Sequence, residues 1–248
     1  PHIDFLARLK QSSELSLLTE GSHGDLVSGI LAGAGNLLPE YRGIAPQANL
    51  MVLHEFETIT QASELHELQQ LMVTCTALSD GCNDPYDLRA SLADRQLYQY
   101  PYLMHIFSAG NAGFEECGYG AGLGWGNITG GTKLAKNTLT VGNTDVDDQL
   151  SPSSSRGPAP DGRLKPDLCA PGQMIGSTLP DNEYGALNGT SASAPVVTGI
   201  YAQLVEAFRV WSGGEDPPSA LLKALLLNTA EDLGNPGPDF LYGFGRAN

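Results

Sequence analysis

Short apolar runs alternate with segments of helical periodicity along most of this chain, and this alternation limits its fold most strongly. The apolar runs cover residues 49–56, 102–108, 138–143 and 174–178 and are rich in Val, Ile, Leu and Phe. Between them, residues 61–73 and 86–98 repeat apolar side chains at helical spacing. Strands that alternate with helices predict an α/β fold, in which helices flank a mostly parallel sheet on both faces.

The C-terminal part predicts two further helices. From Val197 to Trp211 apolar side chains recur every three or four residues, which is typical of a long helix with a broad buried face. A second helix is expected from Ser219, after two prolines that mark its start. Neither a Pro/Ser-rich linker nor a repeat divides the 248 residues, so we expect one domain.

Composition excludes two classes of partner. The chain has 28 acidic and 13 basic side chains, a net charge of −15, and 41% hydrophobic residues, which is a globular composition. So few cations argue against binding to nucleic-acid phosphates or to anionic membrane surfaces. The sequence also contains no apolar run of about 18 residues, the length that a membrane-spanning helix needs.

The four cysteines are too few and too scattered for a disulfide scaffold, and their spacing does not match a zinc site. Cys82 and Cys117 each lie in a glycine-rich loop, so a disulfide between them is one alternative if the protein is exported. Cys75 and Cys169 lie in apolar stretches, where buried free thiols are an equally good interpretation.

Three segments carry side chains suited to catalysis. His23 begins a helix of small and apolar residues. Asn111 follows a predicted strand, at the carboxyl end where ligands of α/β sheets collect, and its amide could donate to an oxyanion. Ser191 opens the long C-terminal helix, near its free N–H groups. Each alone has an ordinary explanation, as a surface helix start, a turn residue and an N-cap serine.

Together the three residues favour acyl transfer. A base, an oxyanion donor and a nucleophile follow one another in the order His, Asn, Ser on an α/β frame. A lipase-type nucleophile elbow needs Gly-x-Ser-x-Gly and a later histidine. Residues 189–193 read Gly-Thr-Ser-Ala-Ser and no histidine follows Ser191, so the order excludes that class of hydrolase.

These segments resemble the subtilisin-like serine peptidases. Gly-Thr-Ser-Ala-Ser-Ala-Pro at 189–195 matches the family's Gly-Thr-Ser-x-Ala-x-Pro signature, with Ser193 in place of the usual Ala. Ser-Ala-Gly-Asn at 108–111 matches the oxyanion segment, and Ser-His-Gly at 22–24 matches the histidine segment. The likeness covers nearly the whole chain, and the loops around Cys82 and Cys117 look most like those of exported bacterial members. Supporting matches lie at 43–46, 155–157, 165–172 and 242–245.

The resemblance implies a three-layer αβα catalytic domain over residues 1–248 and a serine endopeptidase. Ser191 would attack a peptide carbonyl, His23 would act as general base and acid, and Asn111 would stabilise the oxyanion. Peptide or protein substrates, a secreted or periplasmic location and further domains in a longer chain are also implied. No cofactor is required, and structural calcium, which is common in the family, has no ligands assigned. By position, the residues that border the substrate cleft are Thr76, Trp125, Gly126 and Asn127.

The family's catalytic Asp has no match among these residues. The family places it at the end of the first sheet strand, shortly before a stretch like His-Ile-Asp-Phe at 2–5. We therefore expect that strand and its Asp upstream of Pro1, and we assign Asp4 to a structural position. Asp25 is expected to point away from His23 and to meet the helix dipole. Without a carboxylate to orient the imidazole, the 248 residues alone should be nearly inactive.

Two alternatives stay open beside the hydrolase. In a subtilisin-like peptide ligase or macrocyclase, an amine rather than water would resolve the acyl-enzyme, with the same core residues. A non-catalytic, protease-like binding module is favoured by Asp25 and by the unmatched catalytic Asp. The presence of His23, Asn111 and Ser191 argues against it, because a binding module is free to lose any of them.

Overall fold

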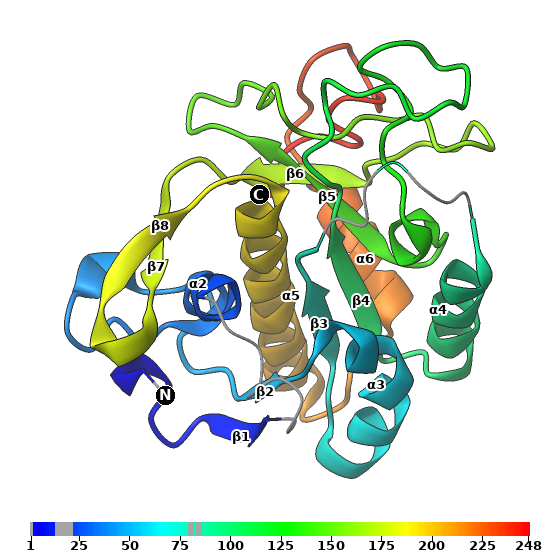
Figure 1. The fold of residues 1–248 in the computed structure, drawn as a ribbon. Helices are drawn as coiled ribbons and strands as arrows, with labels where there is room; N and C mark the ends of the chain where they lie inside the picture. The colour runs from blue at the N-terminus through cyan, green and yellow to red at the C-terminus, as the bar shows by residue number, and fades with distance from the viewer. Residues whose placement is uncertain (1, 13–21, 79–81, 83–85) are drawn as a thin grey trace.

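A four-stranded parallel sheet lies at the centre of the computed structural model, which describes residues 2–12, 22–78, 82 and 86–248 (Figure 1). Every residue of its two inner strands is buried, as in a parallel sheet that is covered on both faces. Its strands neighbour one another in the order β3 (Val73–Thr76), β4 (Met104–Ser108), β5 (Leu139–Thr144) and β6 (Leu168–Pro171).

Helices cover the sheet in two layers. α5 (Thr190–Ser212) contacts all four strands from one face, and α2 (His23–Ala32) and α6 (Ser219–Asn228) pack against α5. α3 (Glu55–Gln69) and α4 (Leu88–Gln99) lie on the other side of the sheet, beside β3 and β4 (Figure 1). The predicted three-layer αβα architecture is therefore confirmed, with its main core between α5 and the sheet.

Smaller elements complete the fold. β1 (Leu9–Ser12) and β2 (Leu50–Val52) form a separate parallel pair. β7 (Ile175–Thr178) and β8 (Tyr184–Leu187) form an antiparallel hairpin, and β7 packs on α2. Among the described ranges, no helix has both the length and the apolar character for crossing a bilayer. Single 3₁₀ turns lie at Ile3–Phe5 (η1), Pro39–Tyr41 (η2), Gly131–Leu134 (η3) and Pro180–Asn182 (η4).

Two of the predicted elements are misplaced. The helix expected over 61–73 begins at Glu55 and ends at Gln69, so that Val73 starts β3 instead. The strand expected over 49–56 shrinks to Leu50–Val52, because the apolar run after it continues into α3. The strand at 174–178 forms as β7 but lies outside the central sheet. The predicted helix at 86–98 and the two C-terminal helices are confirmed within a few residues, and α5 begins at Thr190, next to the predicted opening residue Ser191.

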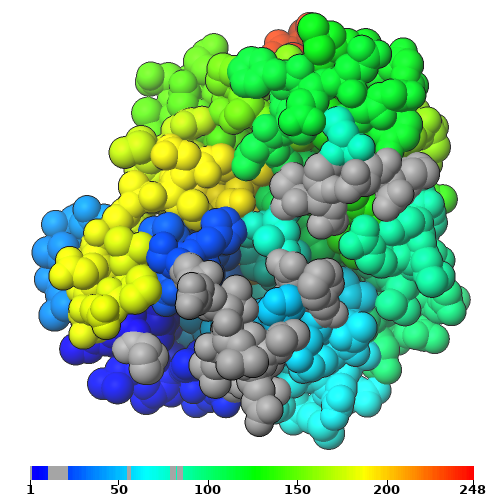
Figure 2. All heavy atoms as spheres, in the orientation of Figure 1, coloured from blue at the N-terminus to red at the C-terminus, as the bar shows by residue number. Residues whose placement is uncertain are grey.

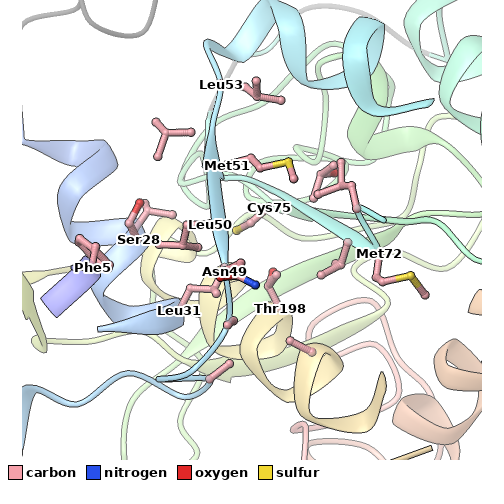
Figure 3. A pocket seen from close by; sticks show the side chains of 18 of the residues that line it. Phe5, Ser28, Leu31, Asn49, Leu50, Met51, Leu53, Met72, Cys75 and Thr198 are labelled. Atoms are coloured by element: carbon pink, nitrogen blue, oxygen red, sulfur yellow. The ribbon is translucent and has the colours of Figure 1, made fainter. Parts of the chain in front are cut away.

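A cavity interrupts the sheet between β2 and β3. Within the described residues β2 pairs only with β1 and β3 pairs only with β4, so each keeps one unpaired edge. Both strands line the same cavity, which has a volume of about 1450 Å³ (Figure 3). Its walls are largely apolar and come from β2, β3, α2 and α5, as the labelled side chains of Leu31, Leu50, Met51, Cys75 and Thr198 show.

Candidate active site

His23 is the first residue of α2 and lines the cavity where the cavity meets that helix. Partial burial lowers the pKa of its imidazole below the ordinary value of 6.5, because the charged form loses hydration. Within the described part of the chain, the imidazole forms neither a hydrogen bond nor an ion pair. A neutral imidazole with a lowered pKa is in the state that a general base requires near neutral pH.

Ser191 lies in the first turn of α5 and lines the same cavity as His23. Its side chain is 9% exposed, and Oγ donates a hydrogen bond of 3.2 Å to the Ala77 carbonyl just after β3. No described residue accepts from its backbone N–H, as expected in the first turn of a helix. The nucleophile candidate thus sits beside an unused backbone donor, although its hydroxyl is turned toward Ala77 and not toward His23.

Asn111 is held beside the start of α5 by a network that fixes the orientation of its amide. Asn111 Oδ1 accepts from Thr190 N at 3.0 Å and from Thr190 Oγ1 at 3.1 Å, while Thr190 Oγ1 accepts from Gly110 N at 3.1 Å. Because Oδ1 faces these donors, Nδ2 is the group left for a developing oxyanion. The sequence analysis did not assign Thr190 to the candidate site, and its place in the Gly-Thr-Ser motif was the available signal.

Gly189 makes the close approach of Asn111 to α5 feasible. It is the residue before α5, with φ at +100°, a conformation that L side chains rarely adopt. A Cβ at this position would lie 2.9 Å from both terminal atoms of the Asn111 amide. The glycine of the motif is therefore required by the close approach of the Asn111 amide, and not only by the helix start.

Neither Asp4 nor Asp25 orients His23. Asp4 is fully buried, and its carboxylate accepts from the backbone N–H groups of Gly35 at 3.0 Å and Asn36 at 2.8 Å. Burial raises the pKa of Asp25 above its ordinary value. Its carboxylate forms no ion pair with His23, which agrees with the expectation that it points away.

The predicted substrate-binding residues fall in two places. Thr76 lines the cavity with His23 and Ser191. Trp125, Gly126 and Asn127 lie in the loop after β4, and Gly126 N donates to Gly157 O at 2.9 Å. Asn127 is buried; its Oδ1 accepts from Arg156 N at 2.6 Å, and its Nδ2 donates to Glu115 O at 3.2 Å. The Asn127 amide therefore anchors this loop, and substrate binding by the three residues stays a prediction.

A disulfide joins the two loops that flank the site. Cys82 follows β3 and Cys117 follows β4, and their Cα atoms lie 5.0 Å apart. Cys75 and Cys169 are free thiols. This matches the alternative considered from the sequence. Among the described residues, no group of three or more His, Cys, Asp or Glu side chains is arranged to hold a metal ion, so calcium stays without assigned ligands.

The parts of the site come from distant segments that meet on one face. In Figure 2 the yellow hairpin β7–β8 adjoins the blue atoms of α2 and the green loops that follow β4. His23 and Ser191 line one cavity, and Asn111 is hydrogen-bonded to Thr190, the residue before Ser191, so the arrangement brings together side chains that could serve as base, nucleophile and oxyanion donor.

Comparisons with known proteins agree with this chemistry. The family model described as "Subtilase family" matches residues 10–245. The serine protease AprX of Bacillus subtilis is 26% identical over 92% of this chain and 57% of its own length. The C5a peptidase of Streptococcus pyogenes serotype M18 is 40% identical over 87 residues, which are 34% of this chain. The chain spans 8% of the length of that peptidase.

Solved structures share the fold. The Prenylagaramide maturation protease PagA superposes with a TM-score of 0.77 at 20% identity, covering 100% of this chain and 86% of that one. The PatG macrocyclase in complex with peptide gives a TM-score of 0.70 at 21% identity, covering 92% of this chain and 66% of that one.

Proposed function

Since the chain belongs to the subtilase family of serine proteases, we propose that it is an endopeptidase whose acyl-enzyme forms on Ser191. One observation carries the proposal. His23 and Ser191, which are far apart in the sequence, line a single cavity, and Asn111 is held against the residue that precedes Ser191.

In the proposed reaction, Ser191 Oγ attacks the scissile carbonyl carbon while His23 accepts the hydroxyl proton. The carbonyl π electrons move to oxygen, and the resulting oxyanion accepts hydrogen bonds from Asn111 Nδ2 and Ser191 N. Collapse expels the amine, which takes the proton from His23 and leaves an acyl-enzyme. Water then attacks the ester carbonyl carbon while His23 accepts its proton; the bond to Ser191 Oγ breaks, the carboxylic acid leaves, and His23 returns the proton to Oγ.

The carboxylate that orients His23 is proposed to come from residues upstream of Pro1. Among the described residues, β2 and β3 each keep one unpaired edge, and both strands line one largely apolar cavity, which suits one further strand. A strand inserted parallel to β3 would end where β3 ends, beside Ala77, because the carboxyl ends of parallel strands lie at one edge of a sheet. Ser191 Oγ donates to the Ala77 carbonyl, and His23 and His2 line the same cavity, so such a strand would end close to Ser191.

Location and substrates follow from the same features. The Cys82–Cys117 disulfide supports a secreted or periplasmic protein, because disulfides persist in oxidising compartments. Substrates are proposed to be peptides or proteins that contact Thr76 and the loop around Trp125, and no cofactor is proposed. Further domains in a longer natural chain are consistent with the small share of the C5a peptidase that is matched.

The test compares this chain with its natural polypeptide extended upstream of Pro1, using a long peptide and mass spectrometry of the products. We expect the extended chain to give products that have gained water, and the Ser191→Ala variant of it to give none. Products that have lost water or joined an added amine would instead support the ligase or macrocyclase. A wild-type extended chain that binds the peptide and leaves its mass unchanged would support the binding module and overturn the proposal.

Cys75 reports separately on the proposed strand. Its side chain is half-buried on the cavity wall, whereas the other free thiol, Cys169, is fully buried and serves as the internal control. Burial raises the pKa of Cys75 to about 11, so labelling with a maleimide is done at mildly alkaline pH. We expect slow labelling of Cys75 in this chain and strong protection in the extended chain. Equal labelling rates in the two chains would place the upstream residues elsewhere.

A further inference from the structure

Side chains of β7 form hydrogen bonds to backbone carbonyls in the first turn of α2. Thr178 Oγ1 donates to the Asp25 carbonyl at 2.9 Å, and Ser177 Oγ donates to the Leu26 carbonyl. Both hydroxyl residues are fully buried. The N-cap residue Ser22 makes no side-chain cap hydrogen bond. The strand β7, and not a helix cap, therefore fixes the turn that begins with His23.

The helix lies very close to β7. A Cβ at Gly29 would lie 2.2 Å from Ser177 Oγ and 2.4 Å from Thr178 Oγ1. Each hydroxyl donates to a helix carbonyl that already accepts the N–H of the residue four positions later. The carbonyls of α2 already have a hydrogen-bond donor within the helix. The Ser177 and Thr178 hydroxyls are therefore additional donors, and their hydrogen bonds join α2 to β7.

The same hairpin leads directly to the nucleophile. β8 ends at Leu187, and Ser191 follows four residues later. The open end of the hairpin is closed by a hydrogen bond of 2.7 Å from Met174 N to Asn188 Oδ1. Gly189 N then donates to Gly172 O at 2.8 Å. Within the segment 172–189, β7 thus contacts α2, which begins with His23. The chain that leaves β8 leads directly to Ser191 at the start of α5.

We propose that Ser177 and Thr178 are positioning residues that set the separation between the His23 imidazole and the Ser191 hydroxyl. The proposal rests on the proposed peptidase function. Proton transfer from the serine requires the imidazole within hydrogen-bond reach, and a misplacement of about 1 Å can cost about 100-fold in rate. Removing the two hydroxyls frees the first turn of α2 to shift relative to the hairpin that carries Ser191.

The test uses Ser177→Ala and Thr178→Val in the extended natural chain, with Thr178→Ser as the variant that keeps the hydroxyl. We expect kcat to fall about 10- to 100-fold in the double variant with KM nearly unchanged, and Thr178→Ser to stay close to wild type. Thr138→Val is the matched control. Thr138 is also buried and donates to a carbonyl, that of Ala135 at 3.1 Å, but it lies at the start of β5.

The outcomes separate positioning from stability. A double variant whose unfolding midpoint falls as in Thr138→Val, while its kcat stays within twofold of wild type, would overturn the proposal. A readout independent of turnover is amide hydrogen exchange of Gly29 and Ile30, whose N–H groups bond the two carbonyls. We expect faster exchange there in the double variant and not in Thr138→Val, even if the wild-type chain cleaves no peptide; unchanged exchange would also overturn the proposal.

Discussion

At the scale of single residues, His105 is a buried base whose protonation is opposed by the loss of hydration. It lies in β4 between Thr74 Oγ1 at 2.7 Å and Gln96 Oε1 at 2.9 Å. Burial lowers its pKa from 6.5 to about 3, so below pH 6.5 the unfolded chain binds a proton that the folded chain refuses. Stability from this group is complete above pH 6.5 and is lost as the pH falls toward 3.

The expected size of that loss is about 2 kcal/mol at pH 5. Urea unfolding of wild type and His105→Asn at pH 5 and pH 7.5 measures it. The variant removes the titrating group, so its free energy of unfolding should change less between the two pH values, by about 2 kcal/mol. Equal pH dependence in the two proteins would show that His105 is protonated in the fold.

Gly24 and Gly29 both lie in α2, but they differ in the space that an added side chain would have. A Cβ at Gly29 would collide with β7, whereas a Cβ at Gly24 would have nothing within 4 Å. Gly29→Ala should destabilise the protein by about 2 kcal/mol or more through overpacking. Gly24→Ala should stabilise it by roughly 0.5–1 kcal/mol, because alanine is the better helix former. Thermal unfolding of both variants checks this, and similar shifts for the two would contradict the packing of α2 on β7.

Short motifs in the sequence allow candidate residues to be named, whereas contacts between distant segments do not. His23, Asn111 and Ser191 are predicted because the family motifs carry them. The sequence does not single out Thr178, because its partner is the Asp25 carbonyl, 153 positions earlier in the sequence. A backbone carbonyl has no signature in an amino-acid sequence, so such a contact becomes visible only when the chain is folded.

At the scale of elements, the Cys82–Cys117 disulfide ties the loop after β3 to the loop after β4. It spans 35 residues, so the closed loop should contribute about 3–4 kcal/mol by constraining the unfolded chain. A reductant should lower the unfolding midpoint of wild type and leave that of the Cys82→Ser/Cys117→Ser variant unchanged. An equal fall of both unfolding midpoints would contradict this prediction, because the reductant would then act through something other than the Cys82–Cys117 disulfide.

Element boundaries were predicted best where burial was complete. β4 and β5 are buried at every residue, and their apolar runs located them correctly. The helix predicted over residues 61–73 was misplaced because only part of its apolar face is buried. Ala62 and Leu65 are buried, but Leu68 is 72% exposed. The helical spacing counts Leu68 among the apolar repeat, whereas tertiary packing leaves its side chain in solvent.

At the scale of the whole molecule, the proposed function depends on the edges of β2 and β3 that are unpaired among the described residues, and on the cavity that both strands line. The sequence resemblance predicts the catalytic Asp upstream of Pro1 but does not say where that segment packs. We propose that it packs in this cavity, which His23 and Ser191 also line. This chain therefore carries a base with a lowered pKa and no carboxylate partner among its described residues.

The most direct test of this account is labelling with a fluorophosphonate probe, with the modified residue identified by peptide mass spectrometry. The probe phosphonylates a serine only when a nearby base activates it. We expect rapid labelling of Ser191 in the chain extended upstream of Pro1, little or none in the 248-residue chain, and none in a His23→Ala variant of the extended chain. Absence of labelling in the extended chain, or labelling that persists without His23, would contradict the account.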